Sequence, residues 1–316
     1  MFQADSYTEK AYKWLKHICD TRIYDKYKDN TAIAYSQMEK ELSYIRKQGS
    51  APLFKVVFEA LTGVRAKPKD FCPMGALASS LISYLLDFSN IDPLESVPKL
   101  YPVFCYGMLG EKKPDIELCV STRIYRGLVR YFNDYSAEVL ILYRHFENGK
   151  ILGIRIIDPQ VKDEIDDYDL RFSFHPIESK KKLRKELYKG DAFEIIRPRS
   201  YEDRVRCKGL MHNAKWTWEE NAKSLFTRGK VPLNMLISHR EDVYEYMMDH
   251  GIGKNYSYII AEYVGKGRPL KKGWEPEMLA AMQKAKIPLW YMESCTKIKY
   301  LFPRAHDMVF LKNFGK

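Results

Sequence analysis

The sequence predicts an α+β fold, in which a small mixed sheet is followed by a mostly helical lobe. Three observations predict it. Apolar and polar residues alternate over residues 115–120, and an Asn-Gly pair separates two β-type segments at residues 148–149. Beyond about residue 176, apolar residues recur mainly at helical spacing.

The N-terminal part of the chain is predicted to be helical. Residues 5–48 carry two apolar stripes at three-and-four spacing, which predict two helices, and Gly49 ends the second one. Residues 51–62 are apolar enough for a third, buried helix. After a polar loop, the segment CPMGALASSLISYLL carries small residues into a further apolar helix.

The strand signals come next. Ile116, Leu118 and Val120 alternate with polar positions, which predicts a strand with one apolar and one polar face. An amphipathic helix is expected to follow over residues 125–132. The pair Asn148-Gly149 joins EVLILYRHF to KILGIRIID, and this combination predicts a β-hairpin.

A composition shift divides the chain in two. An acidic patch at residues 163–169 precedes the basic run KKKLRK at residues 180–185, so we predict a palm-like domain at 1–175 and a fingers-like domain at 176–316. The basic run is typical of a solvated helix face, and phosphate contact is its alternative. The second domain is expected to contain helices at residues 216–226, 242–249, 256–264, 275–284 and 289–300.

Charge and cysteine content limit the function classes. The net charge is +11, and residues 251–316 contain twelve basic and five acidic residues. Such an excess attracts phosphates, although a solubility surface would give the same count. No apolar stretch is long enough for a membrane span, and the six cysteines form no C-x-x-C pair. A reduced, cytoplasmic protein without a membrane contact is expected.

Two features could carry chemistry. Asp115 and Glu117 stand at alternate positions of the predicted strand, so both side chains project from one face, where paired carboxylates could hold Mg²⁺. The solvated face of a strand is the alternative interpretation. The small-residue turn PMGALASS at residues 73–80 could present backbone N–H groups to phosphate, or could serve close packing.

These segments occur in the order found in one family. CPMGALASSLISYLLDFSNIDPL followed by KKPDIELCVS is similar to the glycine-serine turn, I-D-P-L and P-D-I-D segments of bacterial DNA polymerase III α subunits. RPRSYEDRVRCKGLMHNAKW resembles R-P-K-T-F-x-E-L-V-x-I-S-G-L-S-H-G-T-x-V-W of the PolC branch. IPLWYMESCTKIKYLFPRAH resembles V-P-x-W-Y-I-x-S-C-x-K-I-K-Y-M-F-P-K-A-H of the same branch.

The resemblance implies a nucleotidyltransferase-type palm and helical fingers, with DNA-directed nucleotidyl transfer as the activity. Asp115 and Glu117 match the first two metal-binding carboxylates, so Mg²⁺ is the implied cofactor. Nucleotide-binding positions of the family correspond to Gly75, Ser80, Lys297, Lys299, Arg304 and His306. DNA, deoxynucleoside triphosphates and replication proteins are the implied partners.

Departures from the family pattern bear on activity. Met74 and Ala76 stand where the family has arginine and serine, and Glu117 replaces an aspartate. The third carboxylate belongs to the family string L-K-L-D-I-L-G, for which Lys150 or Asp158 is the nearest match here. A catalytically inactive protein that binds DNA or a replication complex is therefore the alternative to a polymerase.

Overall fold

The computed structural model describes residues 7–28, 31–134, 141–147, 150–157, 170–177 and 179–315. The chain divides into two compact units, residues 1–180 and 181–316. The α+β class predicted from the sequence is confirmed.

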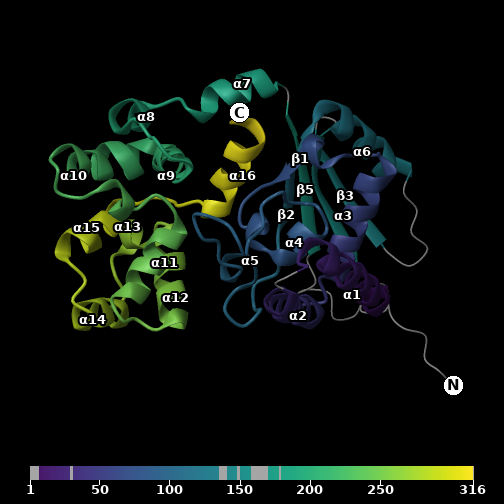
Figure 1. Ribbon diagram of the computed structural model, residues 1–316, viewed down its shortest axis with the longest axis horizontal. Coiled ribbons are helices and arrows are strands. Elements are labelled where there is room, and N and C mark those ends of the chain that lie inside the picture. The colour runs from purple at the N-terminus through teal and green to yellow at the C-terminus, as the bar shows by residue number, and fades with distance from the viewer. Residues whose placement is uncertain are drawn as a thin grey trace. The chain divides into compact units, whose positions relative to one another are not determined.

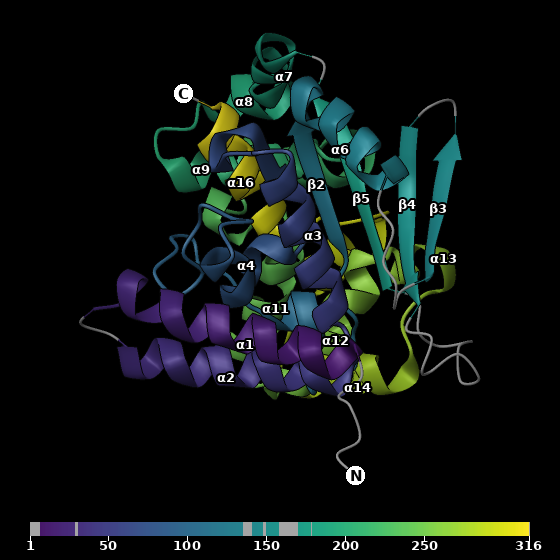
Figure 2. The same ribbon diagram turned by 90° about the vertical axis from the view of Figure 1, so that its right-hand side faces the viewer.

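The first unit is built around a five-stranded mixed sheet with the order β1-β2-β5-β4-β3. Its strands are β1 (Phe71–Pro73), β2 (Ile116–Ser121), β3 (Ile141–Glu147), β4 (Lys150–Ile157) and β5 (Leu170–Ile177). β2 and β5 run parallel, and the other neighbours pair antiparallel. Figure 2 shows β2, β5, β4 and β3 side by side in this order.

The predicted β2 strand and the predicted β3–β4 hairpin are confirmed, although the turn residues Asn148 and Gly149 lie outside the described residues. The sequence analysis missed β1 and β5. β5 pairs with β2 in parallel across more than 50 intervening residues and therefore sets the surroundings of the predicted carboxylates.

The helices of the first unit are α1 (Tyr7–Lys26), α2 (Thr31–Lys47), α3 (Ala51–Gly63), α4 (Leu81–Leu85), α5 (Val103–Tyr106) and α6 (Thr122–Asp134). Short 3₁₀ turns lie at Pro68–Asp70 and Leu77–Ser79. α3 and α6 pack on one face of the sheet, as Figure 2 shows. The first three predicted helices thus correspond to α1, α2 and α3.

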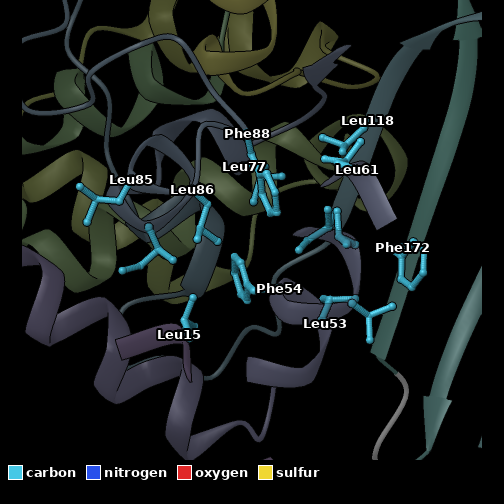
Figure 3. Close-up of a cluster of buried hydrophobic side chains, with 14 of the residues drawn as sticks. Leu15, Leu53, Phe54, Leu61, Leu77, Leu85, Leu86, Phe88, Leu118 and Phe172 are labelled. Atoms are coloured by element: carbon cyan, nitrogen blue, oxygen red, sulfur yellow. The ribbon is translucent and has the colours of Figure 1, made fainter. Parts of the chain in front are cut away.

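The core of the first unit lies between these helices and the sheet. Leu118 on β2 and Phe172 on β5 reach it from the sheet, and Phe54 and Leu15 reach it from the helices (Figure 3). All four side chains are at most 1% exposed. Burial of this apolar area is the main stabilising term, and it leaves the opposite face of β2 and β5 for polar residues.

All regular elements in the described part of the second unit are helices (Figure 1). Its α-helices are α7 (Lys180–Leu187), which begins at the boundary, α8 (Asp191–Ile196), α9 (Tyr201–Met211), α10 (Lys223–Thr227), α11 (Arg240–Asp249), α12 (Lys254–Gly265), α13 (Arg268–Lys272), α14 (Pro276–Lys284), α15 (Leu289–Lys297) and α16 (Arg304–Phe314). A π-helical segment spans Lys215–Ala222, and a 3₁₀ turn spans Leu233–Met235.

Local sequence explains several of these helix starts. Ser200 accepts a hydrogen bond from the Asp203 backbone N–H, and the Asp203 carboxylate accepts one from the Ser200 backbone N–H. This reciprocal capping box fixes the beginning of α9. Prolines stand at or just before the first residue of α14, α15 and α16, where a missing N–H costs nothing. No helix within the described ranges is long and apolar enough to cross a bilayer.

Candidate functional site

The two predicted metal-binding carboxylates lie at the start of β2. Asp115 immediately precedes the strand and Glu117 is its second residue, and both are exposed. Ile116, which lies between the two carboxylates, and Leu118, which follows Glu117, are fully buried. The alternation predicted from the sequence therefore holds here, and it directs both carboxylates away from the core.

The side chain opposite Glu117 belongs to β5. Glu117 pairs in register with Ser173, and Cys119 pairs with His175. The Ser173 Oγ lies 3.1 Å from His175 Nε2, so these two polar side chains contact each other along the strand. Phe172 and Phe174 point into the core instead.

Lys150, one of the two matches to the third carboxylate position, lies outside β2 and its parallel neighbour β5. Lys150 begins β4, which pairs with β3 and β5 and not with β2. The alternative, Asp158, lies outside the described residues. β5 begins with the string L-R-F-S, in which Ser173 is the fourth residue. β5 was not predicted, although Phe172 and Phe174 alternate with Ser173 and His175, which is a strand signal.

The small-residue turn between β1 and α4 lies next to Glu117. The Met74 backbone N–H donates to the Glu117 carbonyl oxygen at 2.8 Å, which ties the turn to β2. Gly75 has a φ of +61°, a left-handed conformation that glycine adopts without strain. A Cβ at Gly75 would meet nothing within 4 Å, so the backbone there borders open space.

Ser80, in contrast, is part of a buried hydrogen-bond network. Its hydroxyl donates to Glu41 at 2.7 Å and contacts the Tyr106 hydroxyl at 2.7 Å. The backbone N–H groups of Leu81 and Ile82 donate to the same Glu41 carboxylate. Burial raises the pKa of Glu41, and these hydrogen bonds oppose that rise. The Glu41 carboxylate therefore already binds the backbone N–H groups at the start of α4. The sequence had indicated these groups as possible hydrogen-bond donors to a phosphate.

In the second unit, Arg304 is buried in an ion-pair network. Its guanidinium contacts the carboxylates of Asp242 at 2.9 Å and Glu245 at 2.7 Å, and the side chain is 3% exposed. Burial opposes the charge on Asp242, but Arg206 and Arg304 outweigh that effect and hold the pKa of Asp242 below its ordinary value. Arg304 thus holds α11 and α16 together from inside the unit.

His306 and its neighbour Asp307 are also internal. Asp307 is fully buried and lies 2.7 Å from His212 Nε2 and 2.9 Å from His239 Nε2. Burial lowers the pKa of His306 to about 4; the neighbouring Asp307 opposes this shift, and Lys208 adds to it. His306 is therefore neutral at pH 7 and stacks on the ring of Phe302.

Exposed cations gather at α13 and at the end of α15, which pack against each other. A Cβ at Gly267 would lie 2.1 Å from the Lys299 carbonyl oxygen, so the turn before α13 directly contacts the segment after α15. Four exposed cationic side chains of this region together define what we call the basic surface. They are Arg268, Lys271, Lys297 and Lys299.

Comparison with known proteins decides the family. Residues 13–247 match the family described as the bacterial DNA polymerase III alpha NTPase domain. The chain belongs to this family. It is similar to PolC-type DNA polymerase III of Thermotoga petrophila, with 37% identity over 115 residues, and of Staphylococcus saprophyticus, with 36% identity over 118 residues. These matches cover 36–37% of the chain but only 8% of either relative.

Membership in the polymerase III family raises the question of whether this site fits magnesium. Two-metal nucleotidyl transfer needs carboxylates that clamp both ions, since oxygen anions are the ligands that Mg²⁺ prefers. Around β2, the described side chains offer the carboxylates of Asp115 and Glu117, the hydroxyl of Ser173 and the imidazole of His175. Among these described side chains two are carboxylates, one fewer than the three that the family resemblance implies.

Proposed function

We propose that this polymerase III relative binds DNA without carrying out nucleotidyl transfer. The observation that supports the proposal most strongly is Ser173, which lies opposite Glu117 on the parallel neighbour strand. A serine hydroxyl is neutral and a weak magnesium ligand. It cannot offset the charge of two divalent ions as an aspartate would.

The predicted nucleotide-binding residues support the same proposal. Ser80, Arg304 and His306 are buried, and Ser80 and Arg304 bond to carboxylates of their own unit. A triphosphate could reach them only by breaking those contacts, which costs several kcal/mol for a buried ion pair. Gly75 is partly exposed, and Lys297 and Lys299 are exposed.

Binding to DNA is supported by the basic surface. Its four cations are exposed, and within the described part of the chain none of them forms an ion pair with a carboxylate. The neighbouring Lys266 and Lys272, in contrast, are paired with Glu262 and Glu275. Unpaired cations attract phosphates by releasing the counterions that surround DNA. We extend the proposal to a cytoplasmic location and to docking on replication proteins.

Loss of the exposed lysines should weaken DNA binding. We expect Lys297→Ala with Lys299→Ala to lower the affinity for a primer-template duplex about tenfold at moderate salt, and to reduce the slope of log K against log salt by about 2 units. Fluorescence anisotropy over a salt series measures both quantities.

The matched control is Lys284→Ala with Lys286→Ala, which removes the same charge from exposed positions at the end of α14. The proposal predicts that the control leaves the salt slope unchanged. An equal loss in both double variants would show that net charge alone attracts DNA, and the basic surface would lose its assigned role.

The second candidate function is template-directed nucleotidyl transfer. The observation that favours it is the pair of exposed carboxylates, Asp115 and Glu117, at the start of β2. Magnesium-dependent primer extension separates the two candidates, because DNA binding alone would leave the primer at its original length.

A further inference from the structure

Two cysteines face each other across the antiparallel pair β1–β2. Cys72 lies opposite Cys119 in the register of the two strands. Opposite residues of an antiparallel pair project from the same face of the sheet. Their neighbours Phe71, Leu118 and Val120 belong to the apolar core, whereas Cys72 and Cys119 do not. Both thiols therefore lie on the face that carries Glu117.

The expected Cα spacing of this pair lies within the range that disulfides span. The Met74 backbone N–H donates to the Glu117 carbonyl oxygen, one position beyond the Pro73–Leu118 pair. Hydrogen-bonded and non-hydrogen-bonded pairs alternate along an antiparallel ladder, so Cys72 and Cys119, two positions away, form a hydrogen-bonded pair. The Cα atoms of such a pair are about 5.5 Å apart. Disulfides join Cα atoms that are about 4.4–6.8 Å apart.

The two thiols are free and lie on neighbouring strands. None of the six cysteines is in a disulfide, and Cys72 and Cys119 stand opposite each other in the β1–β2 register. Cys119 is 9% exposed and Cys72 is 1% exposed, so a small reagent from solvent would reach Cys119 first.

We propose that Cys72 and Cys119 form a reversible disulfide with a peroxide as the oxidant. The thiolate of Cys119 attacks one peroxide oxygen, the O–O bond breaks, and hydroxide leaves, which gives a sulfenic acid on Cys119. The Cys72 thiol then attacks the Cys119 sulfur and gives up its proton to the sulfenic hydroxyl, which leaves as water, while the hydroxide from the first step takes the proton that the Cys119 thiol released. Two thiols and one hydrogen peroxide thus become one disulfide and two waters.

The link would join β1 to β2 two residues from Glu117 and three residues from Gly75. It would therefore fix the turn that borders the polymerase-type site to the strand that carries the carboxylates. This inference does not depend on the proposed DNA binding, because it rests only on the register and burial of the two strands.

Peptide mapping tests the proposal. The full reduced chain is treated with hydrogen peroxide while folded, then denatured, alkylated with N-ethylmaleimide and digested with trypsin. Cys72 falls in the peptide 70–99 and Cys119 in the peptide 113–123. We expect these two peptides to appear as one cross-linked species, lighter by two hydrogens than their sum and separated again by dithiothreitol.

The remaining cysteines serve as internal controls, since Cys19, Cys105, Cys207 and Cys295 are at most 3% exposed. They should stay fully alkylated. Cys72→Ser should leave Cys119 as a sulfenic acid that dimedone traps, and Cys119→Ser should leave Cys72 alkylatable. The proposal fails if the wild-type chain keeps Cys72 and Cys119 alkylatable after peroxide, or if either thiol pairs with one of the four controls.

Discussion

Replacement of Arg304 with alanine is expected to lower the free energy of unfolding of the second unit by about 3–5 kcal/mol. The guanidinium is 3% exposed and neutralises Asp242 and Glu245. Its removal leaves the buried Asp242 and the partly exposed Glu245 with fewer counter-charges. The buried Glu241 also loses an electrostatic partner, because Arg304 opposes the rise in the pKa of Glu241 that burial causes.

Urea unfolding followed by tryptophan fluorescence measures this change, because four of the five tryptophans lie in the second unit. Arg228→Ala is the matched control, since Arg228 is exposed after α10, and a loss of less than about 0.5 kcal/mol is expected there. If Arg304→Ala lowers the free energy of unfolding by less than about 1 kcal/mol, the ion pairs of Arg304 contribute no more than pairs on a protein surface. That result would contradict the interpretation that Arg304 stabilises the unit through a buried network.

Acidification from pH 6.5 to pH 4 is expected to destabilise the second unit by about 3 kcal/mol through His306. Burial lowers the folded-state pKa of His306 from 6.5 to about 4. Above pH 6.5, His306 is neutral in both the folded and the unfolded chain. Between pH 6.5 and 4 the unfolded chain binds the proton and the folded chain does not, so stability falls as the pH falls.

The His306→Phe variant isolates this contribution. Phenylalanine keeps an aromatic ring between Phe302 and Phe310 but does not titrate. The pH dependence of the unfolding free energy should therefore be flatter in the variant over this window. The pKa values of Asp242 and Asp307 are held below the ordinary value, so their contribution is lost only below about pH 4. A variant that loses as much stability as the wild-type chain between pH 6.5 and 4 would refute the assignment.

Much of the fold could be predicted because its signals are local. The alternation around Glu117 and the Asn148-Gly149 pair each lie within one element or one hairpin, and both predicted the observed strands. The first three helices followed from apolar spacing for the same reason. β1 has only three residues, and β5 follows an acidic segment and contains Pro176, which weakens a strand signal.

The surroundings of the site could not be predicted in the same way. Glu117 meets Ser173 only because β5 inserts between β2 and β4, and strand order depends on packing over the whole unit. Arginine side chains are mostly exposed, so the sequence gives no sign that Arg304 is buried. Its partners Asp242 and Glu245 lie about 60 positions upstream in the sequence. Local pattern identifies which residues carry charge, whereas the tertiary fold decides which charges are buried.

Primer extension tests the central claim most directly. The full chain is incubated with a labelled primer-template, all four deoxynucleoside triphosphates and Mg²⁺ or Mn²⁺, and DNA binding is measured by anisotropy in the same sample. The account predicts that the chain binds the duplex, leaves the primer at its original length, and behaves identically with Asp115→Asn. Template-directed extension that Asp115→Asn abolishes would contradict the account, because it would mean that Asp115 and Glu117 hold catalytic metals despite Ser173.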